Sequence, residues 1–254
     1  MNYFSHTILT ILLSALSAGT IFADDKVKVE LYYESQCPGC RDLITKSFHD
    51  AFTTEGFLKM ADVTFVPFGN ARESDGENGA LFTYDCQHGP SECTYNLIEA
   101  CLIDKVKCPH QRFKFINCIE KNDENRSPDP SVFDVVLNAC AFSAVDDDVV
   151  AAISKCYKGK EGNALMHELA SKTLGLDPPH EYVPWVVAQG DHDEDVQNQI
   201  QESLLDYVCS VYEGPNKSEA CSSTSKLRGS TEDLAPSALK KGYCYQENTV
   251  EDIA

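Results

Sequence analysis

The hydrophobic pattern near the N-terminus predicts a strand, a helix and a second strand in close succession. Residues Val27–Tyr33 alternate imperfectly between apolar and polar side chains and are rich in β-branched and aromatic residues, as is typical of a strand. Residues Cys40–Phe52 carry apolar side chains at helical spacing. Residues Val63–Phe68 predict a second short strand, which Pro67 and Gly69 end. Together the three segments predict a βαβ unit.

The pattern changes over residues 70–157, which contain seven of the cysteines. Helical spacing returns at Cys93–Asp104 and at Pro130–Ala141. The segment Glu120–Pro130 is polar and contains two prolines, so it predicts a surface loop. We interpret the whole block, about residues 70–157, as a helical insertion held together by disulfides.

The C-terminal part of the chain resumes alternating elements. It predicts a helix, a strand with a proline near its start and a final helix, at Asn163–Leu174, Tyr182–Ala188 and Val196–Tyr212 respectively. The acidic run Asp191–Asp195 favours a solvated turn and helix N-terminus over a metal-binding loop. The main domain is therefore expected at residues 24–214, followed by a polar, cysteine-containing tail at residues 215–254.

Composition narrows the class of protein. The chain has 254 residues, of which 43% are hydrophobic and 24% are charged, so it can bury a substantial core. Its formal net charge of −19 makes nucleic acid and anionic membrane surfaces unfavourable partners. Twelve cysteines are typical of a compartment in which disulfides persist.

The N-terminus predicts a secretory leader. Residues Ile8–Ala18 form an apolar block, and small residues follow it up to Ala23. This order is typical of a signal peptide, which we place at residues 1–23. The block is shorter than the roughly 20 residues that a membrane span needs. The mature protein is therefore expected to be soluble, in a lumen or outside the cell.

The motif Cys37-Pro38-Gly39-Cys40 lies directly between the first predicted strand and helix. Two thiols at this spacing are typical of dithiol–disulfide exchange, in which Cys37 attacks a substrate disulfide and Cys40 resolves the mixed disulfide. The positive end of the helix dipole would stabilise a Cys37 thiolate. Two other interpretations remain, a structural disulfide and half of a zinc site. The spacing of the other cysteines is too wide for the second half of a zinc site, so no metal is expected.

A longer signature resembles one protein family. The chain contains C-Q-H-G-x-x-E-C-x-x-N-x-x-x-x-C from Cys86 to Cys101, and Tyr182-Val183-Pro184-Trp185 farther on. Together with the Cys37–Cys40 motif, these segments resemble the gamma-interferon-inducible lysosomal thiol reductase family. The residues between the active cysteines, Pro and Gly, and the extra tail segment Gly229–Lys241 depart from the family pattern.

The resemblance implies an α/β protein with a thioredoxin-like fold and a cysteine-rich, disulfide-stapled helical insertion. It implies a glycosylated reductase of lysosomes or endosomes, or a secreted one, that works at acidic pH without a bound cofactor. Its partners would be disulfide-bonded protein substrates and a small-molecule thiol reductant. Pro184 resembles the cis-proline that packs against the redox pair and guides the substrate backbone, so we expect a cis Val183–Pro184 bond and a substrate-binding role.

The sequence also predicts structural disulfides among the remaining cysteines and glycosylation at two asparagines. Ten cysteines are expected to be mostly paired in structural disulfides, with a connectivity that sequence order does not reveal, namely Cys86, Cys93, Cys101, Cys108, Cys118, Cys140, Cys156, Cys209, Cys221 and Cys244. Asn216, and less clearly Asn125 because Pro128 follows its sequon, are candidate glycosylation sites. His88 has two interpretations, a structural hydrogen-bonding residue or an acid–base group near the dithiol.

Two alternative functions use the same sequence features. One is a disulfide oxidase or isomerase of the endoplasmic reticulum or of the secreted space, which runs the same exchange chemistry in another direction. The other is a secreted binding protein without catalysis, in which Cys37 and Cys40 form a structural bridge. Reactivity of one low-pKa thiol after mild reduction distinguishes the catalytic interpretations from the structural one.

Overall fold

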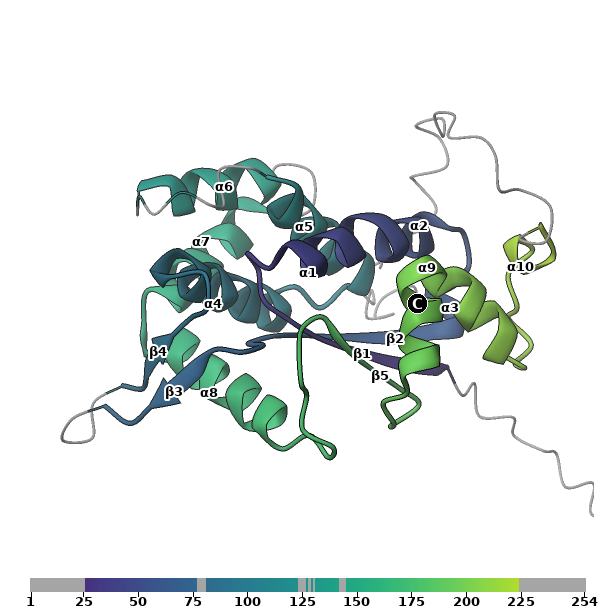
Figure 1. Ribbon diagram of the computed structural model, residues 1–254. Helices are drawn as coiled ribbons and strands as arrows, with labels where there is room; N and C mark the ends of the chain where they lie inside the picture. The colour runs from purple at the N-terminus through teal and green to yellow at the C-terminus, as the bar shows by residue number, and fades with distance from the viewer. Residues whose placement is uncertain are drawn as a thin grey trace, which may run out of the picture.

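The computed structural model describes residues 26–76, 81–122, 127, 129, 131–141 and 145–223. The expected signal peptide, Asn125, Cys244 and the extra tail segment Gly229–Lys241 lie outside these residues. The described chain is a helix-rich α/β protein with two small sheets and several disulfides (Figure 1).

The main sheet has three strands, and the first strand lies in its centre. Strand β1, Val27–Tyr33, pairs in parallel with β2, Ala61–Pro67, and antiparallel with β5, Trp185–Ala188. In this register Leu31 lies opposite Phe65 on one side and Val186 on the other. The two predicted N-terminal strands are confirmed. The final strand begins three residues later than predicted, after Pro184.

The predicted helix between β1 and β2 forms as three consecutive pieces. They are α1, Pro38–Leu43, the π-helical turn η1, Ile44–Phe48, and α2, His49–Thr53. A short helix α3, Phe57–Met60, follows and leads into β2. Apolar side chains at the predicted helical spacing pack against one face of the sheet, where Phe48 and Phe52 contact the ring of Phe65.

In the described part of the chain, five helices lie between β2 and β5 and cover both faces of the sheet (Figure 1). They are α4, Pro90–Lys105, α5, Pro109–Lys121, α6, Ser131–Ala141, α7, Asp147–Tyr157, and α8, Lys160–Leu174. On the second face of the sheet, Trp185 and Val66 pack with Leu169 of α8. The sequence prediction missed α5 and α7. It was also wrong to place Glu120 in a surface loop, because Glu120 lies in α5 and is completely buried.

A second sheet contains only two short strands, β3, Arg72–Ser74, and β4, Thr83–Asp85. Neither was predicted, because three residues are too few to show an alternating pattern. The last helices are α9, Glu194–Val211, and α10, Ala220–Ser223. The side chain of Asp193 caps α9 by accepting a hydrogen bond from the Val196 N–H at 2.9 Å, so the acidic run does begin a helix.

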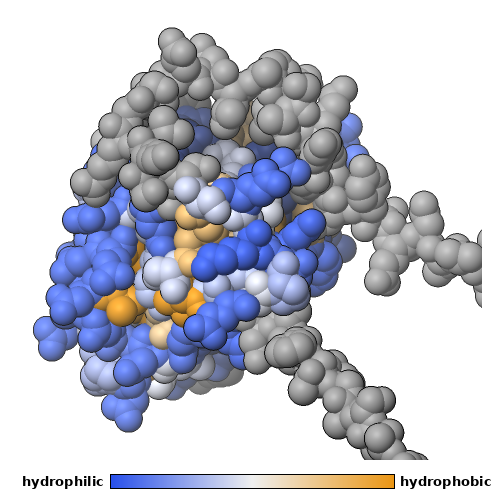
Figure 2. Space-filling view, turned by 90° about the vertical axis from the view of Figure 1, so that its right-hand side faces the viewer, coloured by the Kyte–Doolittle hydropathy of each residue, from blue (hydrophilic) through white to orange (hydrophobic). Residues whose placement is uncertain are grey.

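The face of the molecule near α9 and α10 is mostly hydrophilic, with apolar areas between hydrophilic residues (Figure 2). Exposed large hydrophobic side chains among the described residues are scattered singly, at Leu81, Val135, Leu174 and Val211. No helix in the described ranges combines the length and apolarity needed to cross a bilayer.

Disulfides join the helices of the central block and the end of the described chain. Four pairs among the described residues are Cys86–Cys93, Cys101–Cys156, Cys118–Cys140 and Cys209–Cys221. Cys108 is also disulfide-bonded. The Cys101–Cys156 bond links α4 to α7, and its two cysteines are completely buried.

Replacing both Cys101 and Cys156 with alanine should lower the free energy of unfolding by about 2–5 kcal/mol. The bond closes a separation of 55 residues, so its loss restores many conformations to the unfolded chain. Denaturant titration of both proteins measures the change. The matched control is the double alanine variant of Cys86 and Cys93, which are only seven residues apart. Loss of this shorter link should lower the free energy of unfolding by less. An equal or smaller loss at Cys101 and Cys156 would contradict this account.

Candidate active site

The two cysteines of the Cys37–Cys40 motif lie where β1 leads into the first helix. Cys37 is the N-cap residue of α1, and Pro38 occupies the first helical position, where its missing N–H costs no hydrogen bond. Cys37 is 8% exposed and Cys40 is completely buried. Among the described residues, these are the two cysteines that are not in disulfides. Both thiols are therefore buried, and only Cys37 keeps a small exposed fraction.

The environment of the dithiol separates the pKa values of its two sulfurs. A hydrogen bond from the Cys40 thiol, together with the backbone N–H groups of Cys40 and Gly39 and the charge of His88, lowers the pKa of Cys37 to about 6 despite partial burial. Burial raises the pKa of Cys40 well above its usual value. The sequence had indicated the helix N-terminus as the source of the lowered pKa. The structure adds the Cys40 thiol as the largest contribution.

The loop that precedes β5 contacts the dithiol through Val183 and Pro184. The Cys37 Sγ lies 3.7 Å from the carbonyl oxygen of Val183, and the Val183–Pro184 peptide bond is cis, as predicted. A Cβ at Gly39 would lie 3.3 Å from the Cδ of Pro184, so a larger residue at Gly39 would crowd the proline. Gln197 of α9 donates hydrogen bonds to the Pro184 carbonyl and to the Tyr182 hydroxyl. These contacts hold Pro184 beside the dithiol.

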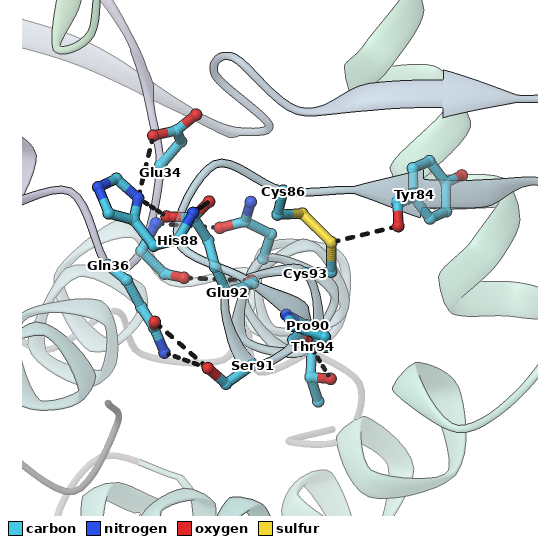
Figure 3. Close-up of a disulfide and its surroundings, with 12 residues drawn as sticks. Glu34, Gln36, Tyr84, Cys86, His88, Pro90, Ser91, Glu92, Cys93 and Thr94 are labelled. Atoms are coloured by element: carbon cyan, nitrogen blue, oxygen red, sulfur yellow. Dashed lines mark hydrogen bonds and ion pairs between the residues drawn. A yellow bond between two sulfur atoms is a disulfide. The ribbon is translucent and has the colours of Figure 1, made fainter. Parts of the chain in front are cut away.

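Side chains at the start of α4 hold the loop that precedes Cys37. The Ser35 N–H donates to the Asn96 Oδ1 at 3.0 Å, and the Gln36 Nε2 donates to the Ser91 Oγ at 3.1 Å. Figure 3 shows Gln36 and Ser91 facing each other beside the Cys86–Cys93 disulfide. The signature from Cys86 to Cys101 therefore contributes a rigid support for the dithiol loop.

His88 lies between two buried carboxyl groups (Figure 3). Its Nδ1 is 2.5 Å from the Glu92 Oε2 and 3.6 Å from the Glu34 Oε2, and its backbone N–H donates to the Glu92 Oε1. Burial and the nearby charge of Glu92 raise the pKa of Glu34 to about 7, although a 2.6 Å hydrogen bond from the Asn70 N–H opposes the change. The charge of His88 also lowers the pKa of Cys37. His88 thus combines a structural contact with an electrostatic effect on the dithiol.

Glu34, His88 and Glu92 are also, among the described residues, a group of side chains close enough together to hold a metal ion. One ligand atom each from Glu34, His88 and Glu92 lies within 4.8 Å of the others. His88 Nδ1 is in hydrogen-bonding distance of the Glu92 Oε2, so a hydrogen bond between the two side chains accounts for their closeness.

Glu34 was not among the residues selected from the sequence. It is completely buried at the end of β1, and Gly69 allows its close approach because a Cβ there would overlap the Glu34 side chain. The sequence signal that could have identified Glu34 was its position three residues before Cys37.

The candidate glycosylation site Asn216 lies exposed in the turn after α9, and its modification remains a prediction.

Replacing Asn96 with alanine should destabilise the protein by about 1–3 kcal/mol, because the buried Ser35 N–H would lose its acceptor. Denaturant titration measures this loss. Asn138→Ala is the matched control, since Asn138 is exposed and its amide donates to the Asp134 carbonyl at the surface. Equal, small effects at both positions would show that Asn96 does not support the loop as described.

Comparison with known proteins identifies the family. Residues 28–142 match the family model described as gamma interferon inducible lysosomal thiol reductase. The chain is 38% identical over 208 residues to the gamma-interferon-inducible lysosomal thiol reductase of Carassius auratus, covering 82% of this chain and 76% of the relative. The protein of the same name from Mus musculus is 36% identical over 197 residues, covering 78% and 72%.

A plant relative extends the similarity. The gamma-interferon-responsive lysosomal thiol protein of Arabidopsis thaliana is 34% identical over 209 residues, which is 82% of this chain and 80% of the relative. The family model and these relatives indicate a thiol reductase, an oxidoreductase that acts on disulfides, as the class of protein. The chain belongs to the gamma-interferon-inducible lysosomal thiol reductase family.

Proposed function

We propose that this protein reduces disulfide bonds of protein substrates at acidic pH, through exchange at Cys37 and Cys40. The observation that carries the proposal is one pair of unpaired thiols at a helix start, in a chain whose other described cysteines are in disulfides. The family relationship supports reductase chemistry. The expected place of action is the lumen of lysosomes or endosomes, or the secreted space, in keeping with the names of the relatives.

The proposed reaction begins at Cys37. Its thiolate attacks one sulfur of the substrate disulfide, forming a mixed disulfide and releasing the other substrate sulfur as a thiol. Cys40 then attacks the Cys37 sulfur, which releases the reduced substrate and forms the Cys37–Cys40 disulfide. Two electrons pass from the dithiol to the substrate. A small-molecule thiol reduces the pair again, so no bound cofactor is needed.

We assign the positioning of the substrate to the Val183–Pro184 segment. The Val183 carbonyl lies 3.7 Å from the attacking sulfur and is part of the loop that leads into β5. A substrate chain in extended conformation beside this loop would bring its disulfide to Cys37. Trp185 and Tyr182, which pack together next to Pro184, keep the loop in place.

A thioredoxin-like core is part of the proposal. Its support is the parallel β1–β2 pair, the antiparallel β5 and the dithiol at the start of the helix that connects β1 with β2. The five helices between β2 and β5 correspond to the proposed insertion, about residues 70–157, and extend it through α8. The domain limits at residues 24–214 and the tail at 215–254 are part of the same proposal.

Reduction of insulin by the protein, followed from about pH 4 to about pH 8 with a small thiol as reductant, tests this function. We expect reduction that persists at about pH 5 and that disappears in Cys37→Ser. The control is Cys209→Ser with Cys221→Ser, which removes a disulfide far from the dithiol in sequence. Faster oxidation of a reduced peptide than reduction of insulin would favour the oxidase alternative. Absence of both activities would favour the structural-bridge alternative.

A further inference from the structure

Helix α9 carries a buried amide in its first turn, at Gln197, which is only 2% exposed. The Gln197 Oε1 accepts a hydrogen bond from the Val186 N–H at 2.9 Å. Its Nε2 donates to the Tyr182 hydroxyl at 2.9 Å and to the Pro184 carbonyl at 3.2 Å. Both donors of the amide and its oxygen are therefore used, and one side chain fixes the backbone on both sides of Trp185.

Neighbouring side chains at the start of α9 reinforce this attachment. The Tyr182 hydroxyl donates to the Glu194 Oε1 at 2.6 Å, and the His192 Nδ1 lies 2.8 Å from the Val186 carbonyl oxygen. Strand β5 is at one edge of the main sheet, where a further chain could pair with its backbone. Because side chains contact both backbone groups of Val186, the place left for a substrate chain is the segment before β5.

One serine joins α9 to the dithiol helix. Ser47 is buried in the π-helical turn η1, which follows α1. Its hydroxyl accepts a hydrogen bond from the Leu204 N–H at 2.8 Å and donates one to the Ile200 carbonyl at 2.5 Å. In an unbroken α-helix these two backbone groups bond to each other, but α9 departs from helical geometry at Ser203, with φ −160° and ψ 104°. The Ser47 hydroxyl therefore replaces a hydrogen bond of α9 with a bridge between two helices.

Helix α9 consequently connects the dithiol helix with the Val183–Pro184 segment. Cys37 is the N-cap of α1, and its Sγ lies 3.7 Å from the Val183 carbonyl oxygen. The Ser47 bridge attaches α9 to the continuation of α1, and Gln197 attaches the Pro184 carbonyl to α9. Losing either contact would change where the Val183–Pro184 backbone lies relative to the attacking sulfur.

We propose that Gln197 is a positioning residue for protein substrates, and that Ser47 anchors the helix from which it acts. The inference rests on the proposed function, in which the Val183–Pro184 segment positions the substrate backbone. A protein substrate must lie along this segment for its disulfide to reach Cys37, and a displacement of about 1 Å can cost much of the rate. A small disulfide without a peptide backbone does not use the segment and needs only the Cys37 thiolate.

Two substrates measured on the same variants separate positioning from chemistry. One is insulin, reduced at about pH 5 with a small thiol as reductant. The other is a symmetrical nitrobenzoate disulfide, which releases a coloured thiolate when Cys37 of the reduced protein attacks it. In Gln197→Leu we expect kcat/KM for insulin to fall at least about tenfold, with the attack on the nitrobenzoate disulfide within about twofold of wild type.

Further variants test the cause of the loss. Gln197→Glu keeps the acceptor for the Val186 N–H and, while its buried carboxyl group is protonated at about pH 5, one donor, so it should recover part of the insulin rate. Gln201→Leu changes an exposed glutamine of the same helix and should leave both rates unchanged. Ser47→Ala should also lower the insulin rate selectively, whereas Thr53→Ala, which removes an exposed hydroxyl bonded within its own helix, should not.

Two results would overturn the inference. One is an unchanged insulin rate in Gln197→Leu, and the other is an equal fall with both substrates, which indicates a general structural effect. If Gln197→Leu does not fold, the same comparison on Gln197→Glu and Ser47→Ala decides, and equal rates relative to wild type on both substrates would again overturn it. A wild-type protein that reduces neither substrate would instead contradict the proposed function of Cys37 and Cys40.

Discussion

Cys40→Ser is expected to remain covalently joined to its protein substrate, through a disulfide at Cys37. The first attack needs only the Cys37 thiolate, whereas release of the substrate needs the second sulfur. The variant should therefore lose turnover completely and accumulate a disulfide-linked adduct, which excess reductant cleaves. Non-reducing electrophoresis followed by peptide mass mapping identifies the joined cysteines. No other described cysteine competes for this role, because the rest are in disulfides.

Cys37→Ser is the matched control for the trapping experiment. It removes the more exposed sulfur and leaves Cys40, which is completely buried and has a raised pKa. We expect neither turnover nor adduct from this variant. An adduct that runs through Cys40 would reverse the assignment of nucleophile and resolving thiol. Adducts of equal yield in both variants would indicate that the two sulfurs are equally accessible, contrary to their burial.

Local sequence patterns were sufficient for the elements around the dithiol. The strand Val27–Tyr33 was predicted correctly because its residue types and alternation are those of a strand, and a strand followed by Cys37-Pro38-Gly39-Cys40 predicts a helix that begins at the motif. The acidic run before α9 could also be predicted to begin a helix, because its cap is a local contact: Asp193 accepts a hydrogen bond from the backbone N–H three residues away.

Contacts between distant segments could not be read from these patterns. Glu34, Glu99 and Glu120 are charged residue types that are usually solvated, and only the tertiary packing of distant segments buries them. The support of Ser35 by Asn96 likewise depends on how the start of α4 meets the end of β1. The resemblance to a family pointed to the segment from Cys86 to Cys101 but not to these contacts.

Helix α5 was missed for a related reason. Its apolar residues lie at helical spacing, but the segment was predicted only as part of the disulfide-stapled block, without a helix of its own. Pro109 occupies the first turn, where proline is compatible with a helix. Recognising α5 would have removed Glu120 from the predicted loop, although its complete burial would still have required the tertiary structure.

Alkylation of reduced Cys37 should remain fast in acid, with a midpoint near pH 6. The pKa of Cys37 is lowered to about 6, chiefly by the hydrogen bond from the Cys40 thiol. At about pH 5 an unperturbed thiol is only about 0.03% thiolate, whereas a thiol with a pKa of about 6 is roughly 10% thiolate. The gain of about 300-fold is partly offset, because a less basic thiolate is about tenfold less nucleophilic. We therefore expect alkylation about 30-fold faster than that of a free thiol.

The Cys40→Ser variant makes the cause of the lowered pKa testable. A serine hydroxyl can still donate a hydrogen bond to the Cys37 thiolate, whereas Cys40→Ala removes that bond and leaves the Gly39 backbone N–H and the charge of His88 in place. The midpoint should consequently move upward more in Cys40→Ala than in Cys40→Ser. Because the thiolate is the reactive form, reactivity is lost as the pH falls through the midpoint, and a higher midpoint removes activity from the acidic range first. A wild-type midpoint near the free-thiol value would contradict an acid-compartment reductase and favour a structural bridge between Cys37 and Cys40.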